Sequence, residues 1–219
     1  MAAISVRPTT ERDRDARAEI VHQAWEHGYA DIFSRAEIAG VFAGRLQMDG
    51  DWIIRRARPV ATVVAEADGE VIGMASMGML VEGDGELAAL YVLPEHQGTG
   101  VGLRLWETSV AHLRALGLGR MEVWAMARAA ATTFYEKRGC RRFATGTFWI
   151  GDHTEPAIGY EFALGRTRGR VGEPGVHLAL VGWRSCHRGV AGRTVLPHIR
   201  LRPPTTVAQR SGATVRGGT

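Results

Sequence analysis

LYVLPEHQGTGVG, residues 90–102, is the stretch of sequence on which the predicted fold rests. It places Gly98, Gly100 and Gly102 between the end of an expected strand and the start of an expected helix. Glycines at such a junction allow successive backbone N–H groups to point into one concavity, and the helix N-terminus adds the positive end of its dipole. The stretch therefore predicts an anion site suited to a phosphate or pyrophosphate. The alternative is a glycine-rich turn that only reverses the chain.

Two other phosphate-binding loops fit this stretch poorly. A Walker loop needs G-x-x-x-x-G-K-[ST], and the absence of lysine here argues against a nucleotide hydrolase. A dinucleotide fingerprint needs G-x-G-x-x-G directly after the strand, but Leu103 stands where the last glycine belongs and residues 94–97 intervene. Glu122 lies at about the right distance downstream for a ribose contact, which leaves the dinucleotide alternative open.

Before the glycine stretch, the pattern predicts two helices and then a run of strands. Capping-box spacings start the helices, Thr10 with Asp13 and Ser34 with Glu37, and the first helix ends at Gly28. The dipeptide Asp-Gly at residues 68–69 predicts a hairpin turn. The expected strands span residues 4–7, 60–66, 71–80 and 87–93, and the second helix runs through Ile38 and Phe42.

After the glycine stretch, apolar residues at spacings of three and four predict an amphipathic helix through Leu103, Trp106, Val110 and Leu113. Beyond it we expect a helix over residues 129–138 and strands over 121–125, 143–150 and 157–164. The predicted order is β-α-α-β-β-β-α-β-α-β-β. This order indicates an α/β (α+β) fold with a mixed, mostly antiparallel sheet flanked by helices.

The charge of the 219-residue chain is unevenly distributed. Its formal net charge is +4, but residues 1–164 hold 17 Lys and Arg against 22 Asp and Glu, whereas residues 165–219 hold ten Arg and a single acid. After residue 164 apolar residues no longer recur at helix or strand spacing, and glycine and proline are frequent. We therefore expect a globular domain over 1–164 and a disordered tail over 165–219. The basic tail leaves open non-specific attachment to nucleic acid or an anionic surface.

The sequence also bears on compartment and metal binding. Two cysteines are too few for a disulfide scaffold, and Cys140 is expected to be a small buried hydrophobe. No signal-peptide pattern opens the chain and no apolar run approaches the ~20 residues of a membrane span. We therefore expect a cytoplasmic protein without membrane attachment. The eight histidines show no metal-ligand spacing, so no metal site is expected.

Three motifs resemble those of the GNAT-type N-acetyltransferase superfamily. They are ELAALYV at residues 86–92, QGTGVG at 97–102, which matches the family's Q/R-x-x-G-x-G/A loop, and FYEKRG at 134–139. The resemblance covers about residues 4–164 and agrees with the predicted order of elements. It implies an enzyme that uses acetyl-CoA to acetylate a primary amine of a small molecule, peptide or protein by direct attack in a ternary complex. The enzyme would act as a monomer or homodimer.

The resemblance also implies where the cofactor binds. The pantetheine arm would lie along the strand at Leu90, Tyr91 and Val92, and an arginine at the position often held by asparagine, Arg128, would meet a phosphate. The loop residues that would hold the pyrophosphate are Gln97, Gly98, Thr99, Gly100, Val101 and Gly102.

For catalysis, the resemblance places Tyr135 at the general-acid position and Glu86 as the base, acting directly or through water. Tyr135 could instead only pack its ring, and Glu86 could be a solvated strand-end charge. Lesser candidates for the base are Glu82, Asp84 and Glu122. The expected walls of the acceptor pocket are Trp25, Tyr29, Phe33 and Trp149. A different class of function stays open, a domain that binds acyl-CoA as a sensor without turnover.

Overall fold

The computed structural model of the protein describes residues 3–46, 48–50 and 57–165. Its strands are β1 (Ser5–Pro8), β2 (Met48–Gly50), β3 (Arg58–Ala67), β4 (Glu70–Met79), β5 (Gly85–Val92), β6 (Arg120–Met126), β7 (Arg141–Ile150) and β8 (His153–Ala163). Its helices are α1 (Arg14–Gly28), α2 (Arg35–Phe42), α3 (Val101–Ala115) and α4 (Ala131–Lys137), with 3-10 turns η1 (Glu11–Asp13) and η2 (Pro94–His96).

The described strands form one sheet in the order β1-β3-β4-β5-β6-β8-β7-β2. Every neighbouring pair in it is antiparallel except β5 with β6. The predicted fold class, a mixed and mostly antiparallel sheet flanked by helices, is therefore confirmed. Strand β2 is an addition to the predicted order, and it pairs with β7 at the edge of the sheet.

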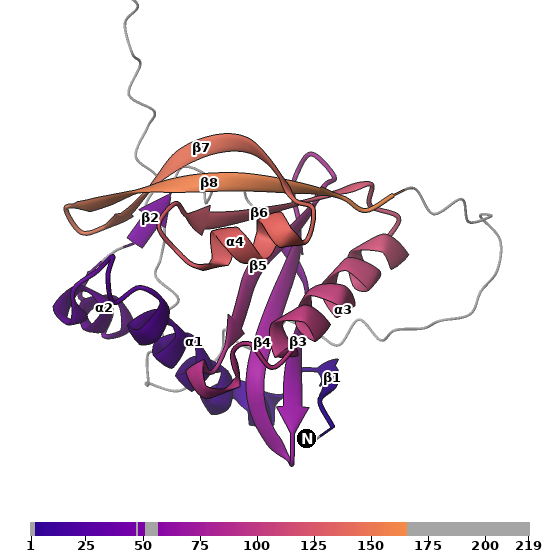
Figure 1. Cartoon of the computed structure of the whole chain (residues 1–219), viewed down its shortest axis with the longest axis horizontal. Coiled ribbons are helices and arrows are strands. Elements are labelled where there is room, and N and C mark those ends of the chain that lie inside the picture. The colour runs from indigo at the N-terminus through magenta and orange to yellow at the C-terminus, as the bar shows by residue number, and fades with distance from the viewer. Residues whose placement is uncertain (1–2, 47, 51–56, 166–219) are drawn as a thin grey trace, which may run out of the picture.

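Helices cover both faces of this sheet (Figure 1). On one face, α3 and α4 pack into a core cluster that contains Leu105 and Tyr135. On the other face, α1 and α2 contribute to separate clusters that include Trp25. Neighbouring residues of β3 divide between the two faces, because Val63 joins the α3 side and Val64 the α1 side. Both faces of the sheet are thus buried around its centre.

Local signals in the sequence account for most element boundaries. Asp68 and Gly69 both have positive φ, 52° and 84°, as the tight turn between β3 and β4 requires. The Ser34 hydroxyl accepts from the Glu37 amide at 3.2 Å, while a Glu37 carboxylate oxygen accepts from the Ser34 amide at 2.8 Å. This reciprocal cap fixes the start of α2.

The predicted tail falls almost entirely outside the described residues. Only Gly165 of the range 165–219 is described, so the expected disorder and the domain boundary at residue 164 stay predictions.

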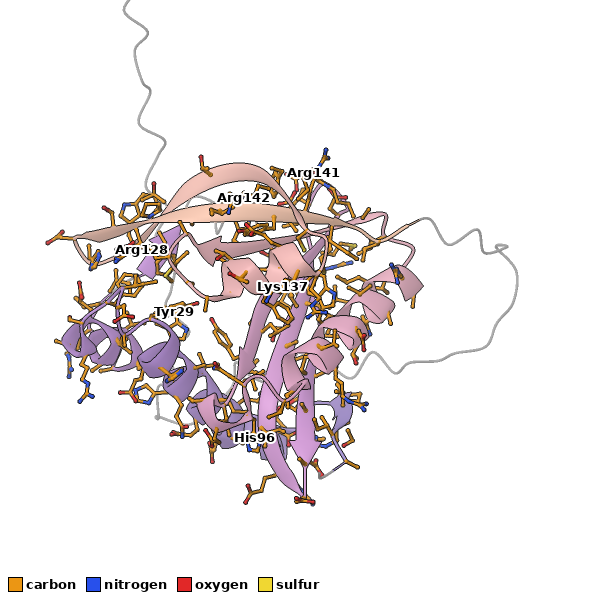
Figure 2. All side chains as sticks on the ribbon, in the orientation of Figure 1. Tyr29, His96, Arg128, Lys137, Arg141 and Arg142 are labelled. Atoms are coloured by element: carbon orange, nitrogen blue, oxygen red, sulfur yellow. The ribbon has the colours of Figure 1, made fainter. Side chains whose placement is uncertain are left out.

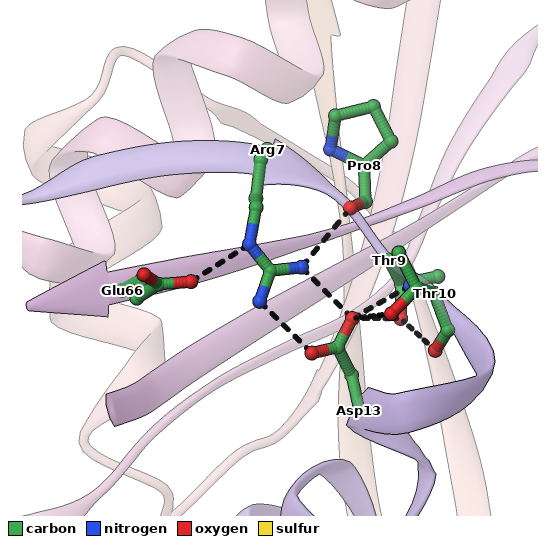
Figure 3. A network of polar contacts seen from close by, with 6 residues as sticks. All are labelled: Arg7, Pro8, Thr9, Thr10, Asp13 and Glu66. Carbon is green, nitrogen blue, oxygen red and sulfur yellow. Dashed lines mark hydrogen bonds and ion pairs between the residues drawn. The ribbon is translucent and has the colours of Figure 1, made fainter. Parts of the chain in front are cut away.

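A buried carboxylate joins the N-terminal strand to the first helix (Figure 3). Asp13 is 4% exposed, and its two oxygens accept from Nη1 and Nη2 of Arg7 at 2.8 and 2.9 Å. The same carboxylate accepts from the Thr10 amide at 2.6 Å, which caps η1. Nε of Arg7 donates to Glu66 on β3 at 2.7 Å. The arginine therefore ties β1 to both β3 and the start of α1, and it holds the pKa of Asp13 well below its usual range.

We predict that Asp13→Asn lowers the free energy of unfolding at pH 7 by about 1–3 kcal/mol. The amide cannot accept both guanidinium bonds, and it leaves the Arg7 charge without its buried partner. Because the pKa of Asp13 is lowered in the folded state, its contribution is present above about pH 4 and is lost as the pH falls further. Urea denaturation at pH 7 and pH 3 measures both effects.

The exposed Asp15 in the first turn of α1 provides the matched control. Asp15→Asn should change the free energy of unfolding by no more than about 0.5 kcal/mol. An equally small effect for Asp13→Asn would show that the Arg7 network adds little to stability.

Candidate active site

Strands β5 and β6 separate soon after they begin. Their parallel ladder covers only two pairs, Gly85 with Met121 and Glu86 with Glu122. On its other side, β5 stays paired with β4 as far as Val92. From residue 87 onward, one edge of β5 therefore faces no strand within the described part of the chain.

The pairing of β5 with β4 determines which backbone N–H and C=O groups point toward that open edge. The Leu93 amide donates to the Ile72 carbonyl at 3.0 Å, so the backbone groups of Leu93 point toward β4. Backbone groups along an antiparallel strand alternate between its two sides. The amides of Leu90 and Val92 therefore point away from β4, into the space that β6 leaves. The Val92 carbonyl on that side accepts from Nε2 of Gln97 at 3.2 Å.

A β-bulge lies at the start of this edge. Ser76 pairs with Ala89 and Met77 pairs with Leu87, so Ala88 is an extra residue on β5. A bulge bends its strand and increases the local twist. The bend therefore coincides with the point at which β5 leaves β6.

The glycine stretch forms the turn between β5 and α3. Gly98 and Gly100 have φ values of 76° and 96°, the left-handed region in which a side chain is strained. A Cβ at either position would meet no atom within 4 Å, so the backbone conformation rather than space requires glycine there. Gly100 is the N-cap of α3, and the Thr99 hydroxyl donates to the His96 carbonyl at 2.7 Å. The first-turn amides of α3 lack intrahelical partners, so the turn offers the donors that an anion needs.

Three elements meet at Gly102 in the first turn of α3. A Cβ there would lie 3.7 Å from Cε2 of Phe134, 3.8 Å from Cγ2 of Val92 and 3.9 Å from Cδ2 of Leu90. Phe134 belongs to α4, and Leu90 and Val92 belong to the open part of β5. The predicted pantetheine strand, the predicted pyrophosphate loop and α4 are therefore neighbours in space.

Tyr135 of α4 is 6% exposed, and its ring packs near those of Trp106 and Tyr160, at centroid distances of 6.0 and 5.9 Å. No hydrogen bond is made by its hydroxyl within the described residues. Burial, and after it the neighbouring Tyr91, raises the pKa of Tyr135 well above its usual value. The phenol therefore carries a proton at neutral pH, and the raised pKa makes it a weaker proton donor than an ordinary tyrosine. This environment is compatible with both the predicted acid role and simple ring packing, so the role stays a prediction.

Two more phenols lie close to Tyr135. The Tyr91 hydroxyl of β5 accepts from Nε1 of Trp25 on α1 at 3.1 Å. The pKa of Tyr29, at the end of α1, is raised first by burial and then by the nearby Tyr91 and Tyr135. Groups from α1, β5 and α4 therefore converge beside the open edge, with Tyr29 facing this region (Figure 2).

The other expected pocket walls differ in accessibility. Trp25 and Phe33 are 4% and 2% exposed and belong to the core cluster beneath α1 and α2. Trp149 on β7 is half-buried. Of the four aromatic residues, Tyr29 and Trp149 thus retain surface that an acceptor can touch.

The candidate bases occupy different environments. Glu122 is 1% exposed and accepts from Nη2 of Arg120 at 2.9 Å. Asp84 accepts from Nε and Nη2 of the same arginine at 3.0 and 2.6 Å. Glu82 is exposed in the turn before β5. Glu86 is half-buried where β5 and β6 separate, with Oε2 3.3 Å from the position that a Cβ on Gly78 would occupy. Its location agrees best with the predicted base, which stays a prediction.

Arg128, the predicted phosphate ligand, has protein partners. Its Nε and Nη2 donate to Glu155 on β8, and its Nη1 donates to the Asp31 carbonyl after α1. The side chain thus joins the loop before α4 to β8 and to the turn after α1. A phosphate would have to compete with these bonds, so the cofactor contact of Arg128 stays a prediction.

The ion pair of Arg128 with Glu155 belongs to a larger network of polar contacts that the sequence did not reveal. Nε2 of His153 lies 3.0 Å from Glu155, and its Nδ1 lies 2.8 Å from Glu37 near the start of α2. The two carboxylates raise the pKa of His153, because both favour the charged imidazolium. Glu37 and His153 are 116 residues apart, so no local sequence pattern could have indicated their contact.

Two further structural findings concern metals and membranes. The described ranges contain no group of three or more His, Cys, Asp or Glu side chains arranged to hold a metal ion. None of the described helices has the length and apolar character needed to cross a bilayer.

Comparison with known proteins gives a family match. A family model described as "Acetyltransferase (GNAT) family" matches residues 23–140. An uncharacterized N-acetyltransferase of Mycobacterium tuberculosis is 36% identical over 101 residues, which represent 43% of this chain and 62% of the relative. The match therefore spans less than two thirds of that relative's length.

Solved structures show the same fold. A GCN5-related N-acetyltransferase from Rhodopseudomonas palustris superposes with a TM-score of 0.58 at 23% identity, covering 74% of this chain and 97% of that chain. The PaiA N-acetyltransferase from Thermoplasma acidophilum, solved in complex with coenzyme A, gives 0.53 at 17% identity, covering 73% and 99%. At these identities the likeness concerns the fold alone.

We predict that His153→Gln lowers the thermal unfolding midpoint more at pH 6 than at pH 9. A raised pKa in the folded state means that the histidine stabilises the fold fully below its usual pKa of about 6.5, and that this contribution is lost as the pH rises through the raised value. The pKa values of Glu37 and Glu155 are lowered, so both partners are charged at pH 6.

Differential scanning fluorimetry of the wild type and the variant at both pH values measures the difference. His27→Gln, at an exposed position of α1, controls for the loss of a histidine and should show no such trend. A midpoint difference for His153→Gln that is equal at pH 6 and pH 9 would contradict the charged bridge.

Proposed function

The chain belongs to the acetyltransferase (GNAT) family, and we propose that it transfers the acetyl group of acetyl-CoA to a primary amine of a small molecule, peptide or protein. The observation that carries this proposal is the open edge of β5 next to the glycine turn at the start of α3. The thioester arm of acetyl-CoA is extended and carries amide groups, which match the open edge of β5. The pyrophosphate at one end of the arm matches the glycine turn.

The pantetheine arm would bind as an added strand. Its amides can pair with the outward-facing backbone groups of Leu90 and Val92, while the pyrophosphate accepts from amides of residues 98–103. Gly102 places no side chain between Phe134 and the end of β5. This arrangement would direct the thioester toward Tyr135 and Glu86, away from the phosphates.

The chemical step would need a proton acceptor and a proton donor. An alkylammonium with an ordinary pKa near 10 must lose a proton before it attacks. Glu86, directly or through water, would accept this proton. The amine nitrogen then bonds to the thioester carbon, and the C–S bond breaks as the tetrahedral intermediate collapses. Tyr135 would donate its hydrogen to the departing sulfur and regain a proton from the former amine nitrogen, directly or through water, which leaves free CoA and the neutral acetylated amine.

A thiol-release assay with acetyl-CoA against polyamines, aminoglycosides, amino acids and peptides tests turnover and acceptor class together. We expect thiol release that depends on one class of amine. Binding of acetyl-CoA without release across the panel would contradict the enzymatic proposal and favour a sensor domain.

We predict that Thr99→Glu weakens acetyl-CoA binding at least about tenfold relative to Thr99→Gln. Thr99 is exposed in the turn, so both side chains fit there, and both variants lose the bond to the His96 carbonyl. They differ only in a negative charge next to the expected pyrophosphate. Isothermal titration calorimetry gives the ratio of the two dissociation constants. Equal affinities would exclude the turn as the phosphate site.

We also predict that Tyr135→Phe lowers kcat by about 100-fold and leaves the KM for acetyl-CoA nearly unchanged. The variant retains the packed ring and removes only the hydroxyl. Tyr160→Phe is the matched control, because Tyr160 is also buried but its hydroxyl donates to Glu136 at 3.1 Å. Turnover of Tyr135→Phe that matches the control would assign the residue to packing alone.

A further inference from the structure

Arg138 directly follows α4 and is one of the two described residues with a buried side-chain nitrogen that has no hydrogen-bond partner. Its guanidinium carbon lies 5.1 Å from the centroid of the Phe134 ring. Its Nε is buried without a hydrogen-bond partner, and within the described residues the guanidinium makes no ion pair. Arginines that do engage carboxylates are Arg7, Arg14, Arg120, Arg128, Arg141 and Arg142.

A half-buried guanidinium without an anion is unfavourable. A buried donor that finds no acceptor costs free energy, and the cost is larger when the group is charged. Buried polar groups left in this state often mark the place of a missing ion or ligand. Nε of Arg17 is similarly unpartnered, but Arg17 lies on α1, which covers the other face of the sheet from α4.

The position of Arg138 points to the cofactor. Phe134 contacts Arg138 on one side, and on another its Cε2 lies 3.7 Å from where a Cβ on Gly102 would be. The Phe134 ring also packs at 6.1 Å from that of Trp106, one turn further along α3. The guanidinium is therefore separated from the first turn of α3 by a single aromatic ring.

Electrostatics favour a cation at this position. Coenzyme A carries a pyrophosphate and a 3′-phosphate, whereas residues 1–164 hold five more acidic than basic side chains. The turn from Gln97 to Gly102 contains no basic residue and offers only neutral donors. The 3′-phosphate is attached to the same ribose as the pyrophosphate, so it must lie close to the turn but beyond its amides. A planar guanidinium fork matches a phosphate there.

We propose that Arg138 binds the 3′-phosphate of coenzyme A and makes the protein select coenzyme A over its dephospho form. This inference rests on the proposed use of acetyl-CoA. Phe134 would orient the guanidinium through its ring face, and the phosphate would accept from the accessible N–H groups of this half-buried side chain and supply the anion that its charge lacks.

Calorimetric titration of the whole chain with coenzyme A and with dephospho-coenzyme A tests the proposal. The wild type should bind coenzyme A at least about tenfold more tightly, and Arg138→Gln should bring the ratio of the two dissociation constants close to one. Arg138→Lys should retain part of the preference, since it keeps the charge without the fork. Arg141→Gln removes a nearby exposed charge that pairs with Glu161, and should leave the wild-type ratio unchanged.

The outcomes separate this inference from the proposed function. Equal binding of the two ligands by the wild type, or an unchanged ratio in Arg138→Gln, would overturn the role of Arg138 while leaving acetyl-CoA as the co-substrate. Failure of the wild type to bind either ligand would overturn both. If circular dichroism shows that Arg138→Gln does not fold, the wild-type ratio and the Arg138→Lys variant still test the proposal. An Arg138→Lys ratio equal to that of the wild type would contradict recognition of the phosphate by the planar guanidinium.

Discussion

The separation of β5 from β6 is the constraint on which the rest of the site depends. Two residue pairs join the strands, and the bulge at Ala88 then turns β5 away. A sheet interior that leaves strand amides unpaired is unfavourable unless something else accepts from them. The fold therefore leaves an open strand edge that runs from Glu86, where β5 and β6 separate, toward the glycine turn at the start of α3.

The two helical layers meet around this open edge. From one face, Trp25 of α1 donates to the Tyr91 hydroxyl on β5. From the other, Phe134 and Tyr135 of α4 pack against α3 through Trp106. An anion bound at the start of α3 would need no net positive domain, because amides and the helix dipole act over a few ångströms. The basic total charge of the chain comes from residues 165–219, so it says little about the site.

Local chemistry explains what could be predicted from the sequence. The Asp68–Gly69 turn, the Ser34 cap and the positive-φ glycines before α3 are all specified by residues a few positions apart. The three-residue strand β2 has too little pattern to be recognised. The bridge from Glu37 through His153 to Glu155, like that from Arg7 to Glu66, joins distant segments and depends on the finished fold. The resemblance placed Tyr135 and Glu86 in the predicted site, but the sequence could not show that Arg120 engages both Asp84 and Glu122.

The most direct test of the account is amide hydrogen exchange of the protein with and without acetyl-CoA, resolved to single residues by NMR. If the cofactor binds as an added strand, exchange should slow at the Leu90 and Val92 amides and at residues 98–103. The Tyr91 amide, which faces β4, should be protected in both states and serves as an internal reference. Unchanged exchange at Leu90 and Val92 under saturating acetyl-CoA would contradict the central claim that the open edge of β5 is the cofactor site.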